Sequence, residues 1–241
     1  MSLLWICVIS AVVCQISVFF TTIYLHRALT HGGLVLNRAM GTLMHLHIAL
    51  FTGIKPREWV AVHRKHHHFS DKEGDPHSPL LYGLWHVFFG NAFYYGKEAG
   101  NPATVQKYTP DYKPDLIDKL PQGLVKFAIF GGLGIFMAMF GWLAGAIAFA
   151  VQGVVYVLLN SSINSICHMI GYRNFENQAT NLQSIALVTG GEGLHNNHHE
   201  YPSSALFALR DGEIDPAWPV IVALEKLGLA KVNRAPIAKA A

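Results

Sequence analysis

Residues 124–167 read LVKFAIFGGLGIFMAMFGWLAGAIAFAVQGVVYVLLNSSINSIC, an apolar run of 44 residues whose single charged side chain, Lys126, lies near its start. A helix needs about 20 apolar residues to cross a hydrocarbon core of roughly 30 Å, so this run is long enough for two membrane spans. Glycines at Gly141–Gly145 predict a tight turn between spans at about 124–141 and 146–167.

A second apolar run, residues 3–24, carries no charge and is also long enough to span. We interpret it as a retained helix rather than a signal peptide, because it has no basic N-terminal region or small-residue cleavage site and continues directly into His26. A third run, residues 40–54, is typical of a buried or interfacial helix because it is only 15 residues long. If it crossed the membrane, it would separate His26 and His31 from His63. The sequence therefore predicts three spans.

The composition agrees with a membrane protein. Hydrophobic residues make up 51% of the 241 residues and charged residues only 14%, whereas soluble domains carry about 25% charged residues. The mean hydropathy is +0.29 and the net charge is only +3, which argues against a disordered chain and against a nucleic-acid partner. Three cysteines without a C-x-x-C pair argue against a disulfide-stapled module.

The basic residues predict the orientation. With the N-terminus outside, all 18 Lys and Arg residues fall on one face of the membrane, which the positive-inside rule makes cytoplasmic. We therefore expect an all-α, multi-pass membrane protein with about three transmembrane helices, placed in a bacterial inner membrane. Residues 1–241 would form a single domain, in which 25–121 and 168–241 build a cytoplasmic helical cap that holds a metal site.

The outlier in composition is histidine, with 14 residues. Nine fall into blocks or beside them: His26 and His31; His63, His66 and His67; His195, His198 and His199; and the isolated His168. The H-x-x-H-H spacing of two blocks places three imidazoles on one side of a helix, and Asn164 and His168 share a face in the same way. His26 and His31 would point about 140° apart on an ideal helix, so a helix distortion or a helix end must intervene if they share a site.

This pattern points to metal binding, because imidazole is the commonest metal ligand and suits iron, zinc and copper. A zinc ion takes about four ligands. Nine histidines are therefore too many for one ion and suit two. The blocks are not a H-E-x-x-H peptidase motif, and only Glu192 to His195 has the E-x-x-H form of soluble di-iron bundles. Of the other histidines, we interpret His45, His47 and His86 as packed residues, and His68 and His77 as surface or supporting positions.

The ordered motifs HRALTH (26–31), HRKHH (63–67), NSICH (164–168) and GEGLHNNHH (191–199) resemble the membrane fatty-acyl desaturases, in particular the Δ9-type acyl-CoA and acyl-lipid group. The flanking EGDPHSP (73–79) agrees with this resemblance. The resemblance covers about Leu25 to Leu229, although the hairpin matches in hydropathy alone. The ordered set is highly specific, whereas one H-x-x-H-H motif would be weak.

The resemblance implies a site and a reaction. The implied metal ligands are His26, His31, His63, His66, His67, His168, His195, His198 and His199, with Asn164 acting through a metal-bound water. Two iron ions would use O2 as co-substrate to insert a cis double bond, at Δ9, into a long acyl chain carried by CoA, acyl-carrier protein or a lipid. Electrons would come from cytochrome b5, ferredoxin or a reductase. A hydroxylase or acetylenase on the same scaffold stays an alternative, and a non-enzymatic membrane metal-binding protein is a third reading.

Asp75 and Glu192 are the first candidates to orient the histidines, ahead of Asp71 and Glu58. Three basic residues, Arg57, Arg64 and Lys65, are candidates for phosphate contacts. The alternative is that they are ordinary basic residues of the cytoplasmic face.

The family commonly has a pair of spans before the first motif and a tryptophan where Ser161 and Ser162 stand here. The acyl tunnel would then be shorter, more open or closed by a second copy in a homodimer. No fused cytochrome b5 motif is present.

Overall fold

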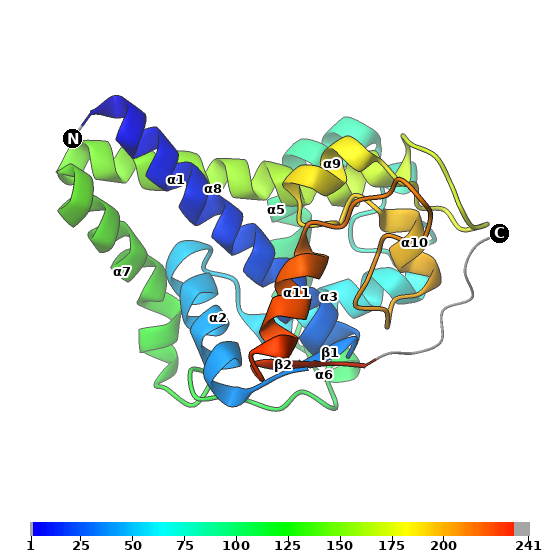
Figure 1. Cartoon of the computed structure of the whole chain (residues 1–241), viewed down its shortest axis with the longest axis horizontal. Coiled ribbons are helices and arrows are strands. Elements are labelled where there is room, and N and C mark those ends of the chain that lie inside the picture. The colour runs from blue at the N-terminus through cyan, green and yellow to red at the C-terminus, as the bar shows by residue number, and fades with distance from the viewer. Residues whose placement is uncertain (1, 234–241) are drawn as a thin grey trace.

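The computed structural model describes residues 2–233. The start of α1 and the turn between α7 and α8 lie together at one end of the molecule, whereas α9 and α10 lie toward the other (Figure 1). The long elements are α1 (Leu3–Phe20), the π-helix η1 (Thr21–Thr30), α2 (Arg38–Phe51), α3 (Pro56–Phe69), α5 (Leu84–Ala99), α7 (Gln122–Phe140), α8 (Trp142–Ser165) and α11 (Ala217–Lys226). The short ones are α4 (Pro79–Tyr82), α6 (Pro102–Tyr108), the 3-10 helix η2 (Ile166–His168), α9 (Gln183–Val188) and α10 (His195–Glu200).

Within residues 2–233, three helices are long and apolar enough to cross a membrane: Leu3–Thr30, Gly123–Phe140 and Trp142–His168. The prediction of three spans is confirmed, and the run at 40–54 forms the shorter helix α2. Two bounds differ from expectation. The first helix extends past residue 24 because η1 continues it. The third begins at Trp142, because the turn needs one residue, Gly141, whose φ of +86° favours glycine.

Gly145, expected in that turn, lies instead inside α8 and is buried. A Cβ placed on Gly145 would lie 2.5 Å from Met137 Cα and would also overlap the carbonyl oxygen of Phe136. The glycine therefore allows α8 to approach the backbone of α7, as small residues do between membrane helices. A glycine in an apolar run serves a close helix contact as readily as a turn, so the sequence pattern did not distinguish the two roles of Gly145.

We expect Gly145→Ala to destabilise the hairpin by about 1–3 kcal/mol, because the added methyl group must displace backbone atoms. Gly134→Ala is the matched control, since a Cβ on Gly134 meets no atom within 4 Å. Thermal unfolding of both purified variants in detergent measures the difference. Equal melting temperatures would show that the close approach of α8 to α7 contributes little.

A two-stranded ribbon was not expected in an all-α protein. Strand β1 (Leu34–Leu36) pairs antiparallel with β2 (Ala230–Val232), with Leu34 opposite Val232. Strands of three residues are too short to show a reliable alternating pattern in the sequence. The ribbon connects the segment after the first histidine motif to α11, and both pack into a buried core with η1 that includes Ile23, Leu34 and Ile221.

Candidate metal centre

The nine histidines singled out from the sequence gather in two groups. His26, His31, His63, His67 and His198 form a five-histidine group, and His66, His168, His195 and His199 form a four-histidine group. Within each group, one ring nitrogen from every member lies within 4.8 Å of those of the others. Residues separated by more than 170 positions in the chain thus share one site, and none of the nine lies outside it.

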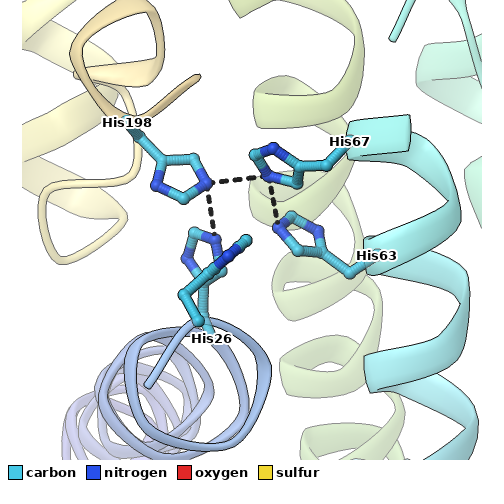
Figure 2. Close-up of side chains that lie close together, drawn as sticks. His26, His63, His67 and His198 are labelled. Carbon is cyan, nitrogen blue, oxygen red and sulfur yellow. Dashed lines mark hydrogen bonds between the residues drawn. The ribbon is translucent and has the colours of Figure 1, made fainter. Parts of the chain in front are cut away.

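Ring nitrogens converge at the centre of each group. In Figure 2, the Nε2 atom of His198 lies 2.9 Å from Nε2 of both His26 and His67, and Nε2 of His67 lies 3.0 Å from that of His63. In the four-histidine group, Nε2 of His195 lies 3.0 Å from Nε2 of His168 and 3.1 Å from that of His199.

These spacings fit metal ligands. Two nitrogens that each lie about 2.0–2.1 Å from a zinc-like ion are about 3 Å apart when they subtend roughly a right angle. Neutral imidazole presents one lone pair, and several lone pairs directed at one point repel each other unless a cation lies between them. The donor set therefore fits a divalent metal ion in each group.

The π-helix explains how the first motif serves one group. Its i→i+5 hydrogen bonds stack residues five apart, and the backbone N–H of His31 donates to the carbonyl of His26 at 3.2 Å. The two rings lie 4.9 Å apart. The distortion that the sequence required between these histidines is thus a π-helix, a feature that often marks functional sites.

The two H-x-x-H-H motifs divide between the groups. His63 and His67, four residues apart on α3, belong to the five-histidine group, whereas His66 belongs to the other. In α10 the division is reversed, because His195 and His199 join the four-histidine group and His198 joins the five. Each motif therefore contributes to both groups, which lie side by side with the His67 and His199 rings stacked 4.4 Å apart.

Three carboxylates accept hydrogen bonds from the outward ring nitrogens. The Nδ1 atoms of His26, His66 and His168 lie 2.6, 3.0 and 2.7 Å from Glu192, Asp75 and Asp71, respectively. Such contacts fix the tautomer, so that Nδ1–H donates outward and the Nε2 lone pair points into the group. The structure thus places Asp75 and Glu192 where the sequence suggested. It gives the same contact to Asp71, which had been ranked lower, while Glu58 pairs with Lys55.

We expect Asp75→Asn to weaken metal binding about 10- to 100-fold, because the amide cannot fix the His66 tautomer as the carboxylate does. Competition with a chelator of known affinity measures the change. Asp211→Asn, which changes an exposed acidic residue in a turn that belongs to no histidine group, is the control. Equal affinities of the Asp75→Asn and unaltered proteins would contradict the assignment.

Burial keeps the inward-facing imidazoles neutral. It lowers the pKa of His31, His63, His67, His195, His198 and His199 well below 6.5, and repulsion from neighbouring imidazoles lowers these pKa values further. Burial alone would raise the pKa of Asp75, but its electrostatic interaction and hydrogen bond with His66 bring this pKa below its usual value. The histidines are therefore ready to bind metal at neutral pH.

We expect the metal-free protein to lose stability as the pH falls below about 6.5. Unfolded histidines bind protons in that range while the buried ones do not, so protonation favours the unfolded state. Denaturation of chelator-treated protein between about pH 8 and about pH 5 tests this sign. A free energy of unfolding that stays constant over that range would contradict it.

Asn164 and the five remaining histidines belong to neither the five-histidine nor the four-histidine group. Asn164 donates from Nδ2 to Asn91 Oδ1 at 3.0 Å. His45 is fully buried against Asp115, His47 contacts Ser17, and His86 and His68 are exposed.

His77 is buried with its ring 4.7 Å from that of His66, so it occupies a supporting rather than a surface position. Arg64 and Lys65 pair with Asp111 and Glu98, and Arg57 donates to Thr109.

The sequence reasoning missed a buried ion pair beside the site. Arg27 is fully buried and donates to both carboxylate oxygens of Asp215, at 2.8 and 3.0 Å. It also donates to the carbonyls of Ala205 and Gly190 and lies 3.8 Å from the ring centre of Phe207. The available signal was its position inside the first motif, where a basic residue next to His26 cannot be an ordinary surface charge.

An apolar cavity of about 670 Å³ adjoins the five-histidine group. His26, His63 and Asn164 line the end nearest the metal centre, and the cavity continues along α8 to Gln152 and Phe149. At 1.5 Å per residue, the 12 residues from Gln152 to Asn164 correspond to about 18 Å of helix. A cavity of this length and composition suits a long, flexible apolar chain.

Residues 3–220 match the family model described as fatty acid desaturase. The chain is 31% identical to a hex-5-enoyl-[acyl-carrier protein] acetylenase of Moorena producens, over 93% of this chain and 75% of that protein. It is 31% identical to an acyl-CoA C20 Delta5-desaturase of Anemone leveillei (96% and 74% covered). It is likewise 31% identical to the Delta-9 acyl-lipid desaturase 2 of Arabidopsis thaliana (89% and 70% covered).

Proposed function

The chain belongs to the fatty acid desaturase family and is an oxidoreductase that acts on acyl chains, and from that premise we propose that it inserts a cis double bond at Δ9 of a long acyl chain. The observation that carries the proposal is that the five-histidine group, with the four-histidine group beside it, adjoins a long apolar cavity. An acyl chain lying in that cavity would contact the five-histidine group, because His26 and His63 line the cavity wall.

The reaction would convert –CH2–CH2– and O2, with two electrons and two protons, into –CH=CH– and two molecules of water. Two iron ions, when bound to the nine histidines, would supply the activation of O2 that breaking an unactivated C–H bond requires. Asp71, Asp75 and Glu192 would hold His168, His66 and His26 in the binding tautomer. Asn164 would hold a water molecule beside the metal centre.

The cavity walls would position the chain and keep water away. Thr21 and Tyr156 both line the cavity, and their hydroxyl oxygens lie 2.7 Å apart, so each satisfies the other and the lining stays effectively apolar. Positioning of one methylene pair is a large part of the catalytic effect expected from such a site.

We propose the cytoplasmic face of a bacterial inner membrane for the histidine groups, with the N-terminus outside. The one-sided distribution of basic residues supports this orientation. The two electrons would come from ferredoxin, cytochrome b5 or a reductase. The relatives named above act on chains attached to acyl-carrier protein, CoA or lipid, so all three are candidate carriers.

A second candidate function is acetylenase activity, which the Moorena producens relative favours. Both reactions begin with hydrogen abstraction from the acyl chain, so the histidine groups are compatible with either. They differ in the substrate, because an acetylenase starts from a chain that already has a double bond.

Expression in a host that lacks the activity tests the proposal, with fatty acids measured by gas chromatography–mass spectrometry. We expect a new monounsaturated acid, whose double bond is located after derivatisation, and none from a His198→Ala strain. A triple bond or a hydroxy acid would replace the proposed reaction with one of the alternatives. Metal-loaded protein that forms no product with any of the three donors supplied would contradict the desaturase proposal.

A further inference from the structure

The cavity reaches the protein surface between α5 and α8. Five of its lining residues on these two helices are also exposed at the protein surface: Phe89 (73% exposed) and Ala92 on α5, and Ala150, Val154 (59%) and Val157 (37%) on α8. Side chains that both line a cavity and reach the surface form its rim. Between α5 and α8 this rim contains only apolar residues, whereas the other exposed lining residues, Gly53 and Lys55, lie in the loop between α2 and α3.

The outer face of α5 is apolar beyond the rim. Trp85, Phe89 and Phe93 follow one another at four-residue spacing and are all more than half exposed, whereas Val87 and Asn91 are buried on the opposite side. A helix that faces water carries charged residues on its exposed side. In α5, which the structure describes completely, the one exposed charged residue is Lys97 near the C-terminal end. This face is therefore suited to lipid.

The rim continues onto a membrane span. On α8, Val151 and Val155 are exposed beside the rim residues, and α5 packs along this helix. A different part of the cavity is polar at its edge, where Lys55 and Glu58 form an ion pair. The cavity thus has a side opening at the level of the lipid chains and a polar edge that suits a headgroup or a carrier.

We propose that the acyl chain enters sideways from the bilayer, through the slot between α5 and α8, so that the substrate is an acyl chain of a membrane lipid. The proposal rests on the proposed function of the same cavity and names its carrier. A water-soluble thioester that threads into the cavity past Lys55 needs no opening toward lipid. A second copy of the chain covering α5 would close the slot. Continuity of the rim with the apolar surface of a span favours lipid.

Trp59 provides a reporter, because it lines the cavity and its ring stacks 4.8 Å from that of His63. The full-length chain would carry Phe at the four other tryptophans, Trp5, Trp85, Trp142 and Trp218. It would be reconstituted into phosphatidylcholine vesicles whose acyl chains carry bromine, a contact quencher of tryptophan fluorescence. We expect quenching of Trp59, because lipid chains enter the cavity through the slot.

Two variants then test the route. Val154→Phe narrows the slot and is expected to lose most of the quenching, and Val157→Phe, also on the rim, is expected to act in the same direction. Val155→Phe is the matched control, because Val155 is the next residue on α8, is 43% exposed and does not line the cavity. It is expected to keep the quenching. Equal melting temperatures of the variants exclude misfolding as the cause.

Absence of quenching by brominated lipid would overturn the proposal, as would equal quenching in the Val154 and Val155 variants. Quenching only by a brominated acyl-CoA, added to vesicles of unbrominated lipid, would instead assign a soluble carrier. A dimer that buries α5 would also leave Trp59 unquenched and so overturn it. The measurement needs no turnover, metal or electron donor, so failure of the route is distinguishable from failure of the desaturase proposal.

Discussion

His198→Ala is expected to abolish product formation and to remove the metal ion of the five-histidine group. Nε2 of His198 lies 2.9 Å from Nε2 of two other members, His26 and His67, so its loss removes a ligand from the middle of the group. It also leaves a space beside His26 that water can enter. The four-histidine group keeps all of its ligands.

Metal analysis of the purified protein and the fatty-acid profile of the expressing cells measure these effects together. We expect about half of the metal to be lost, since two ions of about four ligands each fit the nine histidines. His68→Ala is the matched control, because His68 adjoins the second motif but is exposed and belongs to neither group. It is expected to keep both metal and product. Full metal content and product in His198→Ala would contradict the assignment of this site.

Sequence patterns predicted the parts of this site that depend on composition and spacing. Two spans were evident from residues 124–167 because a membrane-spanning helix requires about 20 apolar residues without charges. Few other structures contain such long apolar runs. The nine histidines were evident because imidazoles clustered at H-x-x-H-H spacing have few structural explanations. In both cases, a local pattern carries the information.

What the sequence did not predict depends on contacts between distant segments. The i,i+3,i+4 rule placed His63, His66 and His67 on one side of α3, but one side of a helix is wide enough to serve two adjacent groups. Which ring joins which group depends on where α10 packs, and no local pattern encodes that. Asp71 ranked below Asp75 for the same reason, because its partner His168 is 97 residues away in the chain.

The ion pair between Arg27 and Asp215, whose members are 188 residues apart, was not predicted either, and it leads to the second large prediction. Asp215→Asn is expected to reduce the free energy of unfolding by about 3–5 kcal/mol, because the Arg27 guanidinium would stay buried without its counter-charge. The side chains of both residues are at most 1% exposed, so solvent cannot compensate. Asp111→Asn is the matched control, since Asp111 pairs with Arg64 at the surface, where such pairs contribute about 0–1 kcal/mol.

Thermal and denaturant unfolding in detergent compares the two variants, and a third variant separates charge from packing. In Arg27→Met with Asp215→Leu, both charges are replaced by apolar side chains of similar size, which is expected to restore most of the stability. Because Arg27 also binds the carbonyls of Gly190 and Ala205, which flank α10, we expect Asp215→Asn to lower metal retention as well. Similar unfolding free energies for the Asp215 and Asp111 variants would show that this pair does not hold α10 against the π-helix, and the geometry of the five-histidine group would then have to depend on its own ligands.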